Sequence, residues 1–158
     1  MLPVRTILHP TDFSEASEYA LGLASGLAAD YHAGLVIIHV VAAPIVLPAG
    51  IVLPDPAPAV DGIRDKLDDL IVSGSDIHVV RRIEEGNPAT EILTMAQLCH
   101  ADLIVMGSHG RHGLSRWLMG SVAEAVMRRA VCPVLTVTNQ PAARCLKCRA
   151  RADETTQV

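Results

Sequence analysis

The fold is decided by residues 103–124, which read LIVMGSHGRHGLSRWLMGSVAE. A short aliphatic run leads into a glycine-rich segment, and the pattern of a helix begins near residue 121. A strand that passes through glycines into a helix is typical of α/β folds, in which ligands bind at the carboxyl ends of parallel strands. The flanking sequence repeats the same alternation of strand and helix.

We expect five strands and four helices along the chain. The predicted helices cover residues 14–31, 60–72, 89–100 and 121–129. The predicted strands are Val4–Leu8, Leu35–Val40, Ile77–Ile83, Leu103–Met106 and Val134–Val137. This order indicates βαβ units with right-handed crossovers. The sequence therefore predicts a single doubly wound α/β domain over residues 1–138, with a parallel sheet of about five strands and helices on both faces, followed by a polar tail over residues 139–158.

The composition is consistent with this fold and excludes some functions. Aromatic residues make up 3% of the 158 residues and hydrophobic residues 50%, so the core must be aliphatic. Aliphatic cores suit parallel sheets that are covered on both faces. The formal net charge of −4 gives no support for a nucleic-acid-binding surface, which normally carries a basic excess.

The first helix carries two specific expectations. Its start can be capped by Asp12 together with Glu15, or by Ser14 alone. Its buried face is predicted from the residues that share one side of the helix at the expected spacing, which are Tyr19, Ala20, Leu23 and Leu27.

The segment 41–60 carries five prolines and predicts an extended loop without helix or strand. Leu35–Leu53 is almost wholly apolar, but prolines and His39 within it argue against a membrane helix. Pro3 and Arg5 interrupt the region where a signal peptide would need an apolar core. We therefore expect a cytoplasmic protein without membrane association.

The glycine-rich segment predicts a site for a phosphate-bearing ligand. Glycines allow a close approach of the backbone, and a helix that starts at Gly120 and Ser121 offers unpaired amides and a positive dipole end. Arg111 and Arg116 are candidate countercharges. A second interpretation stays open, because the glycines can serve the turn alone and Ser121 with Glu124 has the pattern of a capping box.

The spacing Gly107-x-x-Gly110, then nine residues, then Gly120-Ser121 resembles the signature of the ATP-binding branch of the universal stress protein family. The resemblance extends from Val4 to Val137. It includes ILHPTDFS at 7–14, IHV at 38–40, GNP at 86–88 and AVCPVL at 130–135. It implies an adenine nucleotide alpha hydrolase-like, Rossmann-like fold.

The resemblance also implies a ligand, ATP with Mg²⁺, and a set of residues around it. The phosphates are expected at the start of the last helix and the glycines before it, at Gly110, Gly120, Ser121, Val122 and Ala123. The ribose or the metal bound to the triphosphate is expected beside Gly107 and Asp12. The residues expected near the adenine are Val40, Met106, Pro10 and Thr11, and His109 falls within the same binding segment.

The function implied is that of a nucleotide-dependent regulator in the stress response, read by a protein partner that the sequence does not identify. No catalytic residue is predicted, because efficient ATP hydrolysis needs preorganised charge and a group that orients water. Slow ATP hydrolysis, or a dimeric scaffold that binds no nucleotide, are the alternatives left open.

The last strand, Val134–Val137, is short, apolar and expected at a sheet edge. Such an edge can pair with a second strand, so we predict a homodimer through it.

Other chemically active side chains have simpler interpretations. We expect His39 to be a satisfied polar group at the end of a buried strand. His109 and His112 are weak candidates for metal ligands. Cys145 and Cys148 form a C-x-x-C pair that could be redox-active or half of a zinc site, although a tail that contains cysteines is the simpler account.

Overall fold

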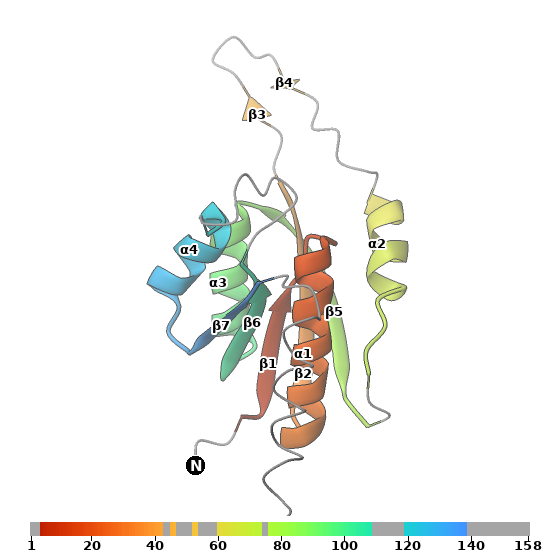
Figure 1. The fold of residues 1–158 in the computed structure, drawn as a ribbon. Coiled ribbons are helices and arrows are strands. Elements are labelled where there is room, and N and C mark those ends of the chain that lie inside the picture. Colours follow the sequence, from red (N-terminus) through yellow and green to blue (C-terminus); the bar gives the residue numbers. More distant parts are fainter. Residues whose placement is uncertain are drawn as a thin grey trace, which may run out of the picture.

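A parallel sheet forms the centre of the molecule (Figure 1). The computed structural model describes residues 4–42, 45–46, 52–53, 60–73, 76–108 and 119–138. The five strands of this sheet lie in the order β5-β2-β1-β6-β7, and every pair is parallel. The strand order reverses between β1 and β6, which is where this class of fold binds ligands. The predicted fold class is confirmed.

The element bounds agree with the predicted alternation. The strands of this sheet are β1 (Thr6–Pro10), β2 (Gly34–Ala42), β5 (Val79–Gly86), β6 (Leu103–Gly107) and β7 (Val134–Val137). The helices are α1 (Glu15–Tyr31), α2 (Val60–Asp68), α3 (Pro88–Leu98) and α4 (Ser121–Arg129). Strand β1 begins and ends two residues later than predicted, so His9 and Pro10 still belong to the strand.

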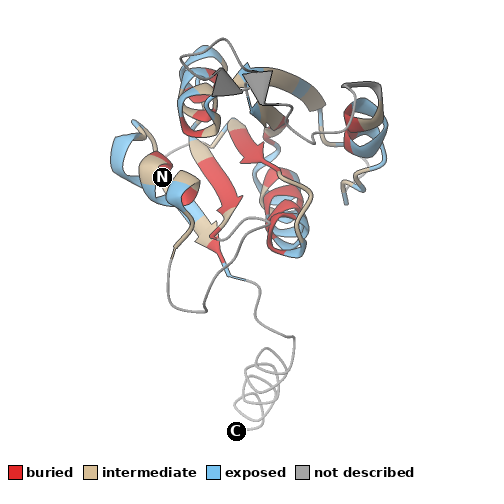
Figure 2. Cartoon of the chain, turned by 90° about the horizontal axis from the view of Figure 1, so that it is seen from above, coloured by how far each residue is buried: buried red, intermediate tan, exposed pale blue. Residues whose placement is uncertain are grey.

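Helices cover both faces of the sheet (Figure 1). The core on the face of α1 and α2 includes Ile7, Leu35 and Val105, and the core on the face of α3 and α4 includes Leu8 and Ile104. Neighbouring residues of one strand therefore enter opposite cores, as the pleat requires. Figure 2 shows the buried residues along the central strands and on the inner sides of the helices.

The predicted buried face of α1 is wrong for two of its four residues. Ala20 is buried and Leu27 packs against the core, but the other two are exposed. Tyr19 is 57% exposed and Leu23 is 40% exposed. The buried residues of the helix are small, apart from one leucine, and are Ala16, Ser17, Ala20, Leu21, Ala24, Ser25 and Ala28. Small side chains let α1 lie close to the sheet, and Tyr19 and Leu23 are on the exposed part of the helix.

Helix α1 approaches the sheet closely at Gly107. A Cβ atom at this position would lie 3.1 Å from the backbone carbon of Ala16 and 3.2 Å from the backbone nitrogen of Ser17. Such contacts are tighter than ordinary van der Waals distances, so a side chain at this position would push β6 and the first turn of α1 apart by a few tenths of an ångström.

Helix α2 is fastened to the sheet by Arg81 of β5. Its Nε–H donates to the carbonyl oxygen of Leu67 at 2.9 Å, and its NH2 group donates to that of Leu70 at 3.2 Å. These carbonyls belong to the last turn of the helix and the residues after it, where intrahelical donors run out. The arginine therefore caps α2, which ends at Asp68 rather than at the predicted residue 72.

The prediction of a loop without strands over residues 41–60 is also wrong. Two short strands, β3 (Ile45–Val46) and β4 (Val52–Leu53), pair in antiparallel fashion within it. No proline falls within either two-residue strand, so both strands keep their amide donors. In the described part of the chain, no helix has the length and apolar character needed to cross a membrane.

Candidate functional site

The turn between β1 and α1 is fixed at Thr11. The amide of Thr11 donates to the carbonyl of Ile38 at 2.8 Å and so extends the β1–β2 ladder by one residue. Its buried hydroxyl lies 2.6 Å from the Ser17 hydroxyl and also accepts a hydrogen bond from the Phe13 amide at 3.1 Å. Thr11 therefore ties the turn both to the sheet and to the first turn of α1.

Asp12 and Ser14 complete this turn. Oδ1 of Asp12 accepts hydrogen bonds from the amide and the hydroxyl of Ser14, at 3.1 and 2.6 Å. The Ser14 hydroxyl accepts from the amide of Ser17 at 3.3 Å, and Ser14 is the N-cap of α1. Of the two predicted capping arrangements, Ser14 alone is confirmed. Asp12 holds the cap in place and keeps its half-buried carboxylate at the carboxyl end of β1.

Phe13 and His39 lie against each other at this end of the sheet. Phe13 has a φ of 61°, in the left-handed region that a bulky residue rarely adopts. Its ring centroid lies 4.6 Å from that of His39, with the planes tilted by 37°. Nδ1 of His39 lies 2.8 Å from the carbonyl oxygen of Thr11 and therefore carries the proton that it donates. The prediction that His39 is a satisfied polar group is confirmed for this nitrogen.

His9 is a buried polar residue that the sequence analysis did not single out. It is 0% exposed, and its Nδ1 lies 2.9 Å from the carbonyl oxygen of Val105, to which it donates. Within the described structure its Nε2 has no hydrogen-bond partner. Desolvation by burial lowers the pKa of His9 to about 4, against smaller opposite effects of the Val105 carbonyl and Asp12. His9 is therefore neutral at physiological pH. The sequence feature that could have indicated this buried residue is the position of a histidine within an otherwise apolar strand.

His9 lies where β1 and β6 separate. The strands are paired at Ile7 with Leu103 and at Leu8 with Ile104, and His9 is the next residue of β1. The side chain of His9 then bridges from β1 to Val105 of β6. This bridge joins the two strands at the reversal of strand order.

Two backbone hydrogen bonds bring the start of α4 to the end of β6. The amide of Ser108 donates to the carbonyl of Val137 at 2.8 Å, and the amide of Gly120 donates to the carbonyl of Ser108, also at 2.8 Å. Residues 108 and 120 are thus neighbours across the glycine-rich segment. The amino terminus of α4 consequently lies at the carboxyl end of the sheet.

Helix α4 starts without a side-chain cap. Its N-cap is Gly120, whereas α1 and α3 are capped by the side chains of Ser14 and Asn87. The predicted capping box is wrong by one residue, because Ser121 is already in the first turn. Glu124 pairs instead with Arg128 at 2.9 Å. Among the residues that the structure describes, the first amides of α4 therefore lack the N-cap side-chain acceptor that the other two helices have.

The predicted site residues come from four parts of the fold that meet at the carboxyl end of the sheet. Pro10, Thr11 and Asp12 end or follow β1, Val40 is near the end of β2, Met106 and Gly107 end β6, and Gly120, Ser121, Val122 and Ala123 open α4. Some side chains serve the core: Met106 and Ala123 are buried in it, and Val40 and Val122 pack against it. His109 and Gly110, and the candidate countercharges Arg111 and Arg116, lie outside the described residues, as do His112, Cys145 and Cys148.

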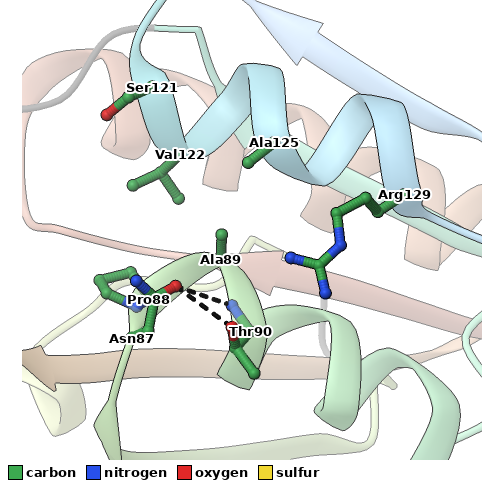
Figure 3. Close-up of a pocket in the computed structure, with 8 residues that line it drawn as sticks. All are labelled: Asn87, Pro88, Ala89, Thr90, Ser121, Val122, Ala125 and Arg129. Carbon is green, nitrogen blue, oxygen red and sulfur yellow. Dashed lines mark hydrogen bonds between the residues drawn. The ribbon is translucent and has the colours of Figure 1, made fainter.

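A cavity of about 340 Å³ lies beside the start of α4 (Figure 3). It lies between the first turn of α3 and the length of α4, and Figure 3 shows the Arg129 side chain reaching from α4 toward α3. The residues that line it are Asn87, Pro88, Ala89, Thr90, Ser121, Val122, Ala125 and Arg129. The exposed start of α4 is therefore accessible from solvent on this side.

A divalent metal could use only a small part of this site. Among the described residues, no cluster of three or more His, Cys, Asp or Glu side chains could hold a metal ion. Asp12 is the carboxylate at the carboxyl end of β1, and carboxylate oxygens suit Mg²⁺. The donor set fits a metal that arrives with its own phosphate ligands and gains one protein carboxylate.

A comparison with protein-family models matches residues 3–138 to the universal stress protein family. A universal stress protein of Methanocaldococcus jannaschii is 58% identical over 53 residues. That match covers 34% of this chain and 31% of the archaeal protein, so the alignment spans about a third of that relative.

Solved structures of similar fold cover nearly the whole domain. The universal stress protein UspA of Lactobacillus plantarum has a TM-score of 0.70 and 26% sequence identity, over 87% of this chain and 99% of that chain. A universal stress protein crystallised in complex with cAMP has a TM-score of 0.66 and 25% identity, over 88% of this chain and 100% of that chain.

Proposed function

Because this chain belongs to the universal stress protein family, we propose that it binds an adenine nucleotide, ATP with Mg²⁺, and acts as a nucleotide-dependent regulator in the stress response. The observation that carries the proposal is the uncapped start of α4, held against the end of β6 at the reversal of strand order. The relative in complex with cAMP supports an adenine nucleotide as the class of ligand.

The phosphates are assigned to the start of α4. The amides of Ser121, Val122 and Ala123 lie in its first turn, and the positive end of the helix dipole favours anions. The Ser121 side chain is exposed and adds a hydroxyl. Gly120 has no side chain that would compete with a phosphate for these amides. His109 and Gly110 remain predicted members of the same phosphate site.

The adenosine part is assigned to the turn after β1 and the neighbouring ends of β2 and β6. The predicted residues at these strand ends are Pro10, Thr11, Asp12 and Gly107, together with Val40 near the end of β2. Met106 is buried in the core, so it would support the adenine site from below rather than line an open surface. Asp12 would stand beside the ribose or complete the coordination of Mg²⁺ on the triphosphate.

The first experiment measures the nucleotide content of the purified, heat-denatured protein. Calorimetric titration of the emptied protein with Mg-ATP follows. We expect co-purified or tightly bound adenine nucleotide. If no adenine nucleotide binds, the glycines serve only the turn, and the chain is a stress-family scaffold without this ligand.

A negative charge at position 121 distinguishes an effect on phosphate binding from an effect on helix stability. Ser121→Asp adds a negative charge in the first turn of α4, which stabilises a helix by about 0.3–1 kcal/mol but repels a phosphate. We expect weaker ATP binding without loss of stability. Gln97→Glu is the matched control. It adds the same charge at an exposed position near the carboxyl end of α3. Equal affinities of both variants and the wild type would contradict the phosphate assignment.

The same preparation tests whether ATP is consumed. We propose a regulator rather than an enzyme, because the sequence identifies no group that would orient water against a γ-phosphate. Phosphate release should therefore stay at the level of a nucleotide-free control. Release that depends on this protein would favour the slow ATPase.

A regulator that responds to ATP belongs in the cytoplasm, and the protein partner that reads the bound state is still to be found.

We also propose a homodimer through β7. In the described structure this strand pairs only with β6, and Leu135 on it is 38% exposed. An open apolar edge favours pairing with a second copy. Light scattering should show a dimer that Leu135→Glu dissociates, while Val131→Glu, at a 78% exposed position outside the strand, leaves it intact. A monomer at high protein concentration would contradict the proposal.

A further inference from the structure

The turn after β1 depends on a side chain from β2. His39 is half-buried and lies one residue beyond Ile38, whose carbonyl accepts from the Thr11 amide. Its own Nδ1–H donates to the carbonyl of Thr11 at 2.8 Å. Strand β2 therefore holds both the amide and the carbonyl of Thr11, the first through its backbone and the second through His39.

The second contact of His39 is with a backbone outlier. Phe13 has a φ of 61°, which places its backbone in a region that bulky residues avoid. Such a conformation persists only where its surroundings determine it, and two contacts do so here. The Phe13 amide donates to the Thr11 hydroxyl at 3.1 Å, and the Phe13 ring packs on the His39 ring at 4.6 Å.

One imidazole thus fixes two points of the turn. Its nitrogen sets the Thr11 carbonyl and its ring supports the Phe13 side chain, and Asp12 lies between these two residues. The Asp12 carboxylate is oriented by Ser14 at the end of the same turn. If the hydrogen bond is lost, the carbonyl of the buried Thr11 is left without its donor, and the residues proposed to meet the ribose or the metal lose their preset geometry.

We propose that His39 is a positioning residue of the nucleotide site: it holds the turn of residues 10–14, with Phe13 in its left-handed conformation, before the ligand arrives. This inference rests on the proposed function, because the turn is assigned to the adenosine part of the nucleotide. His39 acts through Thr11 and Phe13 and makes no contact with the ligand in this proposal. Preorganisation of this kind raises affinity by lowering the ordering cost of binding.

Two substitutions separate the roles of the nitrogen and the ring. His39→Asn keeps an N–H donor near the position of Nδ1 but removes the ring. His39→Phe keeps a ring but leaves the Thr11 carbonyl without its donor. His78→Asn and His78→Phe are the matched controls, since His78 is an exposed histidine that precedes β5.

The ligand-free readout is amide hydrogen exchange of Thr11 and Phe13, measured by NMR well below the unfolding temperature. We expect His39→Phe to accelerate these two amides by about tenfold or more relative to core amides, because a lost partner for a buried group costs about that factor. His39→Asn should restore the exchange rates to within about threefold of the wild type, because its amide keeps the donor. A merely structural defect would instead speed exchange across the whole sheet.

The second readout is affinity for Mg-ATP. We expect His39→Phe to lower the affinity by about tenfold, His39→Asn to recover most of it, and both His78 variants to match the wild type. If the wild type binds ATP and His39→Phe binds it equally well, the inference is overturned while the proposed function stands. If the wild type binds no adenine nucleotide, the proposed function fails and the role of His39 in the nucleotide site fails with it. Unchanged exchange at Thr11 and Phe13 in His39→Phe overturns the inference in either case.

Discussion

Acid should destabilise this protein through His9. Its ring is fully buried at the junction of β1 and β6, where burial lowers its pKa from 6.5 to about 4. Folding therefore favours the neutral ring. Between these two pH values the unfolded chain binds a proton that the folded chain does not, so stability falls as pH falls from 6.5 toward 4.

The magnitude follows from the two pKa values. Linkage between 6.5 in the unfolded chain and about 4 in the folded chain gives a loss of about 2 kcal/mol on going from pH 7.5 to pH 5. The loss approaches about 3.4 kcal/mol below pH 4, at about 1.36 kcal/mol for each pH unit between the two pKa values. Below that pH both states are protonated and the contribution of His9 stays constant.

The assay is urea unfolding of wild type and His9→Asn at pH 7.5 and pH 5. Asparagine keeps a donor for the Val105 carbonyl but does not titrate, so it removes the pH dependence of this site whatever it costs in packing. We expect the wild type to lose about 2 kcal/mol more than the variant, which corresponds to about 1 M urea at a typical slope. His78→Asn removes an exposed histidine and should follow the wild type.

The decisive quantity is the difference between the two pH responses, because other titrating groups contribute equally to both proteins. Equal responses of His9→Asn and wild type would refute the reasoning. They would mean that the ring is protonated in the folded protein or that the unfolded chain holds it in a similar environment.

Three further substitutions test contacts elsewhere. Gly107→Ala should lower the free energy of unfolding by about 1–3 kcal/mol in chemical denaturation, because its Cβ meets backbone atoms of α1. Gly26→Ala has open space around it and should raise the free energy of unfolding by about 0.8–1 kcal/mol in the same assay. Asn87→Ala removes the acceptor of the Thr90 amide and should cost about 1 kcal/mol, and Asn87→Asp should restore it. Arg81→Met should cost about 1–2 kcal/mol and speed hydrogen exchange in α2 rather than in α1; uniform exchange would argue against a local cap.

The sheet could be predicted because its strands are aliphatic runs separated by helical patterns. Strands buried on both faces lack alternation, so their run length and glycine or proline borders indicate them. The last helix, from Ser121 to Arg129, and the last strand, from Val134 to Val137, have the predicted bounds. The pair β3–β4 escaped prediction, because two-residue strands carry no periodicity.

The inner face of α1 could not be predicted from hydrophobicity. Tyr19 and Leu23 have a helical spacing, but the buried residues of α1 are alanines and serines together with Leu21. How closely the helix lies to the sheet is a property of the assembled layers. Sequence patterns that rank residues by size and apolar character point to the wrong side of such a helix.

At the candidate site, the sequence indicated the segments but not their connections. Glycine spacing and the turn at Asp12 could be recognised, because each is local. The bond from His39 to the Thr11 carbonyl joins residues that are 28 positions apart, and the bond from His9 to the Val105 carbonyl joins residues that are 96 apart. Only strand pairing brings these groups together, so neither contact had a signal in the sequence.

Phe13 is the one phenylalanine of the chain, and it occupies the turn at the carboxyl end of β1. A protein grown with fluorinated phenylalanine would therefore give a single fluorine resonance, free of overlap, from the centre of the candidate site. The resonance would report the ring's environment beside His39 in every state of the protein. Because the core is otherwise almost free of aromatic rings, the molecule already contains a one-site spectroscopic reporter for whatever enters this turn.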